Sequence, residues 1–280
     1  MESDNVPTLI RQQEHTPARF DRGLALFGGG ILATFLLFLL LPGDIASKAH
    51  AALHGLCAQR PSHSLWMGGT PLPLDARMTG IYLGAAVTGA WLLVAGRLRA
   101  RGPLSHATVI TLGLGVLVMA LDGGNALLVD LALPHPYEPS NRLRLITGSL
   151  AGIALGVGLG YLFAITIWER GERDRSVVGT PRELVVPLVG TLALGALAMS
   201  GLPILYAPFA VGLVGAAVMV FWTLAMVLLA LIGNLAWSYR DVGSLVPLGL
   251  GAGVAAIMAI ALLSGLRFAA ERFLGLPSFT

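Results

Sequence analysis

Long apolar stretches separated by short polar segments dominate this chain. A bilayer core of about 30 Å needs about 20 apolar residues per helix, and seven stretches are long enough. They cover residues 23–41, 79–96, 107–128, 145–168, 184–202, 208–237 and 245–266. None shows the alternating segments of about ten residues that are typical of membrane β-barrels. The pattern therefore predicts seven transmembrane helices, the spanning structure that satisfies every backbone hydrogen bond within one segment.

The composition agrees with this interpretation. Of the 280 residues, 55% are hydrophobic and 12% are charged, whereas soluble domains carry about 25% charged residues. A water-soluble protein and a disordered chain are both excluded. We expect an all-α integral membrane protein with a polar cytoplasmic tail over residues 1–22, expected to be disordered, and a single membrane domain over residues 23–280.

The first apolar stretch also has some features of a signal peptide. The tripeptide Ala49-His50-Ala51 resembles a cleavage site. However, the stretch exceeds the usual apolar length of about 7–15 residues and follows a polar tail. We therefore interpret it as a retained membrane anchor.

The distribution of Lys and Arg predicts the orientation, because cytoplasmic loops are enriched in these residues. Eleven fall on one side: Arg11, Arg19, Arg22, Arg97, Arg99, Arg101, Arg170, Arg173, Arg175, Arg182 and Arg240. Seven fall on the other: Lys48, Arg60, Arg77, Arg142, Arg144, Arg267 and Arg272. We expect a cell (inner) membrane protein with its N-terminus in the cytoplasm and its C-terminus outside. The scattered basic residues form no stripe that would bind nucleic acid.

Glycines recur at four-residue spacing in two predicted spans. They are Gly80 and Gly84 in one span, and Gly148, Gly152, Gly156 and Gly160 in another. Such a face lets a neighbouring helix backbone approach closely. Tight packing within the bundle is the favoured interpretation, and a homodimer seam or a partner membrane protein is the alternative.

The predicted spans contain few ionisable groups, which weakens a proton-coupled transport function. Asp122 is the exception, and the Gly123-Gly124 pair after it is expected to break the helix. The two long outer loops, residues 42–78 and 122–144, each lead into a transmembrane helix. Their polar side chains are therefore expected to meet near the outer membrane surface.

The first outer loop carries a metal-site hypothesis. Residues 44–59 are rich in alanine and predict a short helix that begins after Asp44. On that helix His50, His54 and Cys57 would share one face, and Asp75 or His63 could complete a transition-metal site. The alternative is that these side chains pack against the bundle. Apart from this metal hypothesis no cofactor is predicted, and a single cysteine excludes an intramolecular disulfide.

Two sequence signatures resemble the predicted membrane proteins grouped as domain of unknown function 2085. That family shows Cys-His-x-x-Pro-x-Arg-Ser followed by Pro-Leu-Cys-Ala-Arg-Cys-Thr-Gly-Ile-Tyr-Leu-Gly, and later Asp-Gly followed by Asn-x-x-Arg-x-x-Thr-Gly. The resemblance covers about residues 53–160 and leaves an additional three-helix part, residues 184–268, outside it. The matching positions include Cys57, Pro61, Ser64, Arg77, Gly80, Tyr82, Gly84, Asp122, Gly123, Asn141, Arg144, Thr147 and Gly148.

The departures from the family pattern remove its thiol chemistry. Ala58 stands where the family often has His, and Asp75 and Met78 stand at the two later cysteines. What matches is a polar and conformational set. The resemblance implies an integral membrane protein with an outer-face motif, and it implies no activity.

The matched polar residues predict an ion pair. Arg77 and Arg144 each lie near the start of a span, and Asp122 lies near the end of another, so we expect the carboxylate to pair with one of these guanidinium groups. Asn141 is expected to donate to the same carboxylate. All of these residues would then form one ionic cluster at the outer face.

Three functions fit this cluster. The favoured one is a non-enzymatic membrane component or accessory subunit, in which the cluster fastens the helices together. The second is an interfacial enzyme or a protein that binds lipid or an anionic small molecule, with His63 as a general base. The third is a small-molecule transporter.

Overall fold

The computed structural model describes residues 38, 40 and 42–275 of the chain. Within this part, six helices are long and apolar enough to cross a membrane: Ala76–Val94, His106–Asp130, Asn141–Ile167, Pro181–Met199, Pro203–Ile232 and Gly243–Leu274. Each overlaps one of the predicted stretches. The first predicted stretch, residues 23–41, and the polar tail, residues 1–22, lie outside the described residues.

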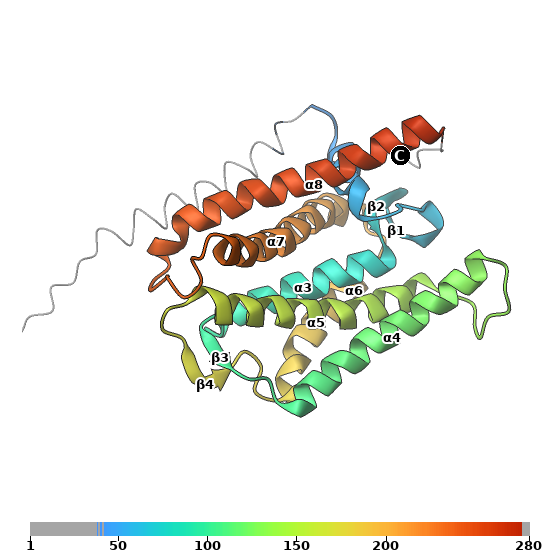
Figure 1. Ribbon diagram of the computed structural model, residues 1–280. Helices are drawn as coiled ribbons and strands as arrows, with labels where there is room; N and C mark the ends of the chain where they lie inside the picture. The colour runs from blue at the N-terminus through green and yellow to red at the C-terminus, as the bar shows by residue number, and fades with distance from the viewer. Residues whose placement is uncertain (1–37, 39, 41, 276–280) are drawn as a thin grey trace, which may run out of the picture.

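Short elements cover the two ends of the helix bundle (Figure 1). The helices are α2 (Ile45–Leu53), α3 (Ala76–Val94), α4 (His106–Asp130), α5 (Asn141–Ile167), α6 (Val185–Met199), α7 (Tyr206–Ile232) and α8 (Val246–Leu274). The strands are β1 (Ser64–Met67), β2 (Thr70–Asp75), β3 (Ala100–Gly102) and β4 (Glu172–Ser176). Short 3-10 turns are η1 (His54–Leu56), η2 (Pro61–His63), η3 (Pro181–Leu184), η4 (Pro203–Leu205) and η5 (Gly243–Leu245).

Side-chain caps determine where several helices begin. Asp75 accepts a hydrogen bond from the backbone N–H of Met78 at 2.8 Å and so starts α3. Ser105 and Ser140 cap α4 and α5 in the same way. These caps satisfy backbone donors that a helix leaves free at its first turn. The starts of α3 and α5 lie at the same end of the bundle as the end of α4, where Arg77 and Thr147 contact Asp122.

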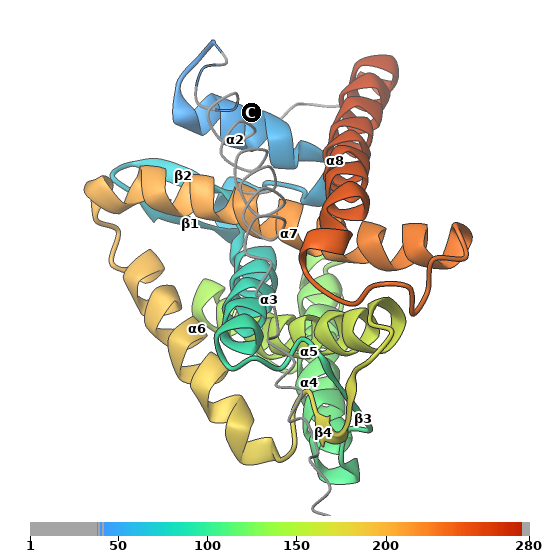
Figure 2. The ribbon, with the colours of Figure 1, turned by 90° about the vertical axis from the view of Figure 1, so that its left-hand side faces the viewer.

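Helices α3 and α5 run side by side through the middle of the bundle (Figures 1 and 2). A Cβ atom added at Gly84 would lie 2.7 Å from the carbonyl oxygen of Ser149, and one at Gly148 or Gly152 would overlap the backbone of α3. The glycine faces therefore pack against each other within the chain. The homodimer seam considered at these glycines is wrong, because the face is already occupied.

The structure is mostly helical, as the predicted all-α class requires, and two small two-stranded sheets lie at the ends of the bundle. Strands β1 and β2 form an antiparallel hairpin, and β3 and β4 pair in parallel at the opposite end of the bundle. Gly68 and Gly69 connect β1 to β2 with φ values of 56° and 81°. A two-residue hairpin turn with both φ values positive favours glycine, which has no Cβ penalty there.

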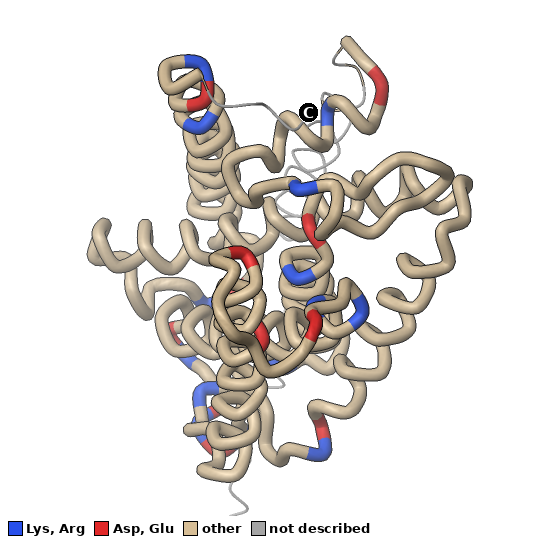
Figure 3. The backbone as a smooth tube through the Cα atoms, turned by 90° about the vertical axis from the view of Figure 1, so that its right-hand side faces the viewer, with Lys and Arg blue, Asp and Glu red and all other residues tan. Residues whose placement is uncertain are grey.

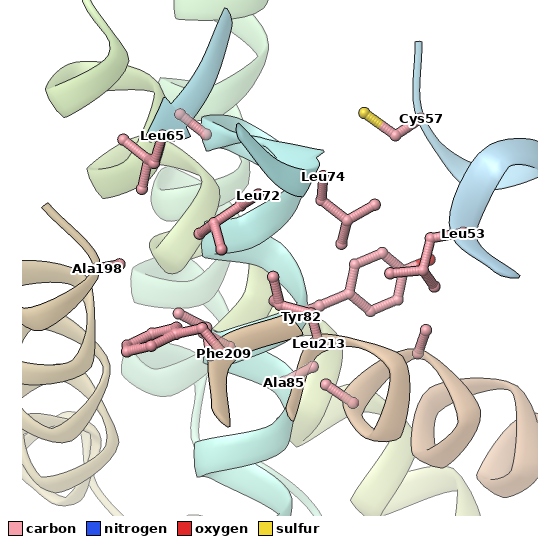
Figure 4. Close-up of a cluster of buried hydrophobic side chains, with 14 of the residues drawn as sticks. Leu53, Cys57, Leu65, Leu72, Leu74, Tyr82, Ala85, Ala198, Phe209 and Leu213 are labelled. Carbon is pink, nitrogen blue, oxygen red and sulfur yellow. The ribbon is translucent and has the colours of Figure 1, made fainter. Parts of the chain in front are cut away.

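We call residues 42–75, which hold α2, η1, η2, β1 and β2, the cap. Its apolar side chains join the largest buried cluster of the described residues, together with side chains of α3 and α7. Figure 4 shows Leu53, Leu72 and Leu74 of the cap beside Tyr82 of α3 and Leu213 of α7. The cap is thus packed onto the bundle through apolar contacts, and the polar site lies beside it.

Candidate functional site

Asp122 is the centre of a polar cluster where α4 meets α3 and α5. Asp122 is only 2% exposed. The carboxylate accepts hydrogen bonds from Arg77 Nη2 at 2.6 Å, Tyr137 OH at 3.0 Å and Thr147 Oγ1 at 3.1 Å. A buried carboxylate needs such partners, because an uncompensated charge away from water is costly. The predicted ion pair between Asp122 and an arginine is present, and its partner is Arg77.

The helix around Asp122 is unbroken. The predicted break at Gly123-Gly124 is wrong, since α4 continues from His106 to Asp130. A Cβ atom at Gly123 would come within 3.8 Å of Arg77 Nη1. That is an ordinary van der Waals distance, so neither a helix break nor a close contact requires glycine at this position.

Tyr137 closes the cluster from the loop between α4 and α5. Besides its hydroxyl bond to Asp122, its backbone oxygen accepts from Asn125 Nδ2 at 2.8 Å. Partial burial and the hydrogen bond to the Asp122 carboxylate raise the pKa of Tyr137. The phenol therefore remains a donor, and the loop is tied to α4 at two points.

Asn141 and Arg144 form a second group, separate from Asp122. Asn141 Nδ2 donates to the backbone oxygens of Ser62 and Ser64 at 3.1 and 3.2 Å. Arg144 Nη1 donates to Asn141 Oδ1 at 2.9 Å, and its Nη2 lies 3.4 Å from His63 Nε2. The expectation that Asn141 donates to Asp122 is wrong, because its amide is used on η2 and β1. The single ionic cluster is instead two neighbouring groups.

His63 is held beside a cation. Burial, and then the positive charge of Arg144, lower the pKa of His63. The neutral imidazole can therefore accept the Arg144 N–H at Nε2. This contact occupies the nitrogen that a general base at this position would use.

The metal-ligand set is not assembled by the fold. Helix α2 begins after Asp44 as predicted, but it ends at Leu53, and Cys57 is in extended backbone. His50, His54 and Cys57 therefore do not share one helical face. His50 Nδ1 bonds to Ala46 O, and both ring nitrogens of His54 have other partners. Among the residues that the structure describes, no group of three His, Cys, Asp or Glu side chains is arranged to hold a metal ion.

Cys57 is a buried thiol with two backbone donors. Its Sγ accepts from the N–H groups of Gln59 at 3.4 Å and Asp75 at 3.2 Å. Burial, with the nearby Asp75 carboxylate, raises the pKa of Cys57 to about 12. The side chain is therefore an apolar and weakly accepting group inside the cap, where it links the segment after η1 to the end of β2. Figure 4 labels it in the buried cluster.

We expect Cys57 to resist alkylation while the protein is folded. The thiolate is the reactive form, and the folded state keeps the thiol protonated well above its ordinary pKa of 9.0. The contribution of the buried neutral thiol to the free energy of unfolding is therefore fully present below the ordinary pKa of 9.0. It is lost as the pH rises toward the pKa of the folded state, about 12. Mass spectrometry after iodoacetamide treatment checks this, because Cys57 is the single cysteine. Equal labelling of folded and denatured protein would contradict it.

The remaining matched positions lie where the cap packs against α3 and α5. Pro61 opens η2, and Ser64 Oγ donates to Arg60 O at 3.1 Å where β1 begins. The matched positions Gly80, Tyr82, Gly84 and Gly148 lie in α3 and α5 and are buried. The two signatures thus meet at the joint between the cap, α3 and α5.

Two features of the site have different origins in the sequence. Thr147 lies three residues after Arg144 in α5, so helical spacing places these two side chains on the same face. Tyr137 has no comparable signal, since its position depends on how the loop folds back over α4. An exposed ion pair also lies at the cap end of the bundle, where Arg60 Nη1 is 2.8 Å from Asp130 Oδ2.

The two comparisons with individual proteins give no relative. No curated protein matches the chain, and no solved structure does. A family model does match, and it is described as predicted membrane protein (DUF2085). The match covers residues 57–158, which agrees with the predicted range of about 53–160. The part of the chain that builds the Asp122 and Arg144 groups is therefore similar to a family of predicted membrane proteins, domain of unknown function 2085.

Proposed function

We propose that the protein is a non-catalytic component of the cell (inner) membrane, an accessory subunit in which one polar group fastens helices to each other and the other holds the cap on the bundle. The observation that supports this most directly is how the polar side chains are used. Asp122 joins α4 to α3, α5 and the loop that carries Tyr137. Asn141 joins α5 to η2 and β1. Each contact fixes one element of this chain against another.

Helix α4 offers the surface for a partner subunit. Of the six described spans it is the least buried by its own chain: 17% of its most apolar 18-residue stretch is buried, against 56% for α5. In Figure 1 it lies along one edge of the bundle. The large apolar side chains exposed on it include Val109, Ile110, Leu114, Leu117 and Val118. Small residues such as Gly113, which has open space where a Cβ would lie, allow close approach of another helix.

We expect substitution on α4 to release the partner. The tagged full chain, purified in a mild detergent, should carry a second membrane protein in fixed stoichiometry. Leu117→Trp should lower its recovery about tenfold, because the larger ring prevents close helix packing. Met258→Trp is the matched control, since Met258 is an exposed apolar residue of α8. A wild-type chain that purifies alone, or equal losses in both variants, would count against the proposal.

An anionic ligand at Arg144 is the second candidate. This residue is 7% exposed, and no carboxylate of the described residues lies within 4.0 Å of its guanidinium. Such a cation favours a phosphate or carboxylate ligand. Inorganic phosphate would then raise the melting temperature of the wild type and leave that of Arg144→Gln unchanged. An equal response of both proteins removes this candidate.

We also propose a number of membrane spans and an orientation for the chain. Seven spans follow if residues 23–41 also cross the bilayer, with the N-terminus inside and the C-terminus outside. In the described residues the end with β3 and β4 holds eight Lys and Arg, against seven at the cap end. The excess of Lys and Arg on the predicted cytoplasmic side therefore depends on Arg11, Arg19 and Arg22 of the N-terminal tail. Figure 3 looks onto the cap end, where the charged positions are scattered.

Transport has less support. The hydroxyls of Thr88, Ser149 and Thr191 each donate to the carbonyl four residues earlier in their own helix. Such bonds satisfy a buried hydroxyl without a second helix or a substrate. These residues are thus used within single helices of the bundle.

A further inference from the structure

His54 is a buried histidine that the polar groups above do not use. It is fully buried between the cap and the last turns of α8. Its ring stacks on Phe268, with centroids 4.0 Å apart and an interplanar angle of 14°. Nδ1 lies 2.8 Å from Gln59 Oε1, and Nε2 lies 2.8 Å from Glu271 Oε2.

The contacts of Gln59 determine which ring nitrogen of His54 carries a hydrogen. Gln59 Nε2 lies 2.9 Å from two carbonyl oxygens, those of His50 and Pro73. Only an amide nitrogen can donate to both, so the other amide atom is the oxygen. Gln59 Oε1 is an acceptor, and His54 Nδ1 must therefore donate to it.

A neutral His54 would then present a lone pair to a carboxylate. With Nδ1 protonated, a neutral imidazole has an unprotonated Nε2. Glu271 Oε2 is also an acceptor when the carboxylate is ionised, so this 2.8 Å contact needs one additional proton. Arg267 Nε donates to the other oxygen, Glu271 Oε1, at 2.8 Å. That bond favours the ionised carboxylate and leaves the proton on His54.

We infer that His54 and Glu271 form a binding site for one proton, held as an imidazolium–carboxylate pair, and that this proton fastens the outer end of α8 to the cap. Other contacts place the pair at a close joint. Gly55 N donates to Ser264 Oγ at 3.0 Å. A Cβ atom on Gly55 would overlap the backbone of α8 at Leu263.

The ionisable groups around the pair come from three parts of the chain. Arg267 of α8 also donates to the backbone oxygens of His54, Cys57 and Ala58. From α2 the nearby group is His50, and from the segment after η1 it is Cys57, whose thiol accepts from the N–H of Asp75. Without this proton two acceptors would face each other at 2.8 Å, and the joint between His54 and Glu271 would open.

Nitrogen-15 spectra of the histidine-labelled full chain in detergent micelles test this inference. At about pH 7 an ordinary imidazole is mostly neutral. We expect both ring nitrogens of His54 to carry a hydrogen at that pH. In Glu271→Gln the amide can donate to Nε2 without an extra proton, so only Nδ1 should remain protonated. His50→Gln is the matched control and should leave the His54 signals unchanged.

Signals are assigned from His54→Asn, or by replacing the other histidines singly if that variant does not fold. A neutral His54 in the wild type, or a protonated one in Glu271→Gln, overturns the inference.

Discussion

Replacing Asp122 with Ala is expected to lower the free energy of unfolding by about 3–5 kcal/mol, the cost of leaving a buried charge without its partner. Arg77 is 22% exposed on its side chain, so the lower end of this range applies. The substitution also removes the acceptor of Tyr137 OH and one of the two acceptors within reach of Thr147 Oγ1. Reversible unfolding in mixed detergent micelles measures the loss. Asp122→Asn keeps the shape and an acceptor oxygen, so its loss should be smaller.

Asp130→Ala is the matched control on the same helix. Its partner Arg60 and Asp130 itself have side chains that are 46% and 36% exposed. Solvent screens such a pair, and exposed pairs contribute about 0–1 kcal/mol. A small effect at Asp130 beside a large one at Asp122 is expected. Equal effects at the two positions would show that burial of Asp122 is not what makes its ion pair important.

Hydropathy was sufficient to predict the six described spans, because a long apolar run has few other solutions in a bilayer. The helix ends were less predictable, since they depend on polar contacts. Helix α8 extends to Leu274, eight residues beyond its predicted end at 266. Its last turns contain Arg267 and Glu271, which pair with each other and with groups of the cap. Those contacts allow a charged segment to continue the helix.

The candidate site was predictable only in part. Asp122 is an isolated charge in an apolar span, so an arginine partner could be predicted from the free-energy cost of an unpaired charge in the bilayer. The sequence could not show which arginine is the partner, because that depends on the contacts of Arg144 with Asn141 and His63. The metal-site hypothesis failed for a local reason, since the helix ends at Leu53 and a 3-10 turn follows. Sequence spacing alone does not indicate where such a short helix stops.

Gly152→Ala is expected to destabilise the protein by about 3 kcal/mol, the upper part of the range for overpacking. An added Cβ would overlap the carbonyl group of Ile81 and lie 2.8 Å from its Cα. These are backbone atoms of α3, so no rotamer change relieves the overlap and the helices must separate. Gly158→Ala on the same helix meets open space, and there alanine should stabilise by about 1 kcal/mol through helix propensity. Unfolding of both variants in mixed micelles gives the comparison, and a Gly152→Ala protein as stable as Gly158→Ala would show that the close contact of α3 with α5 is absent.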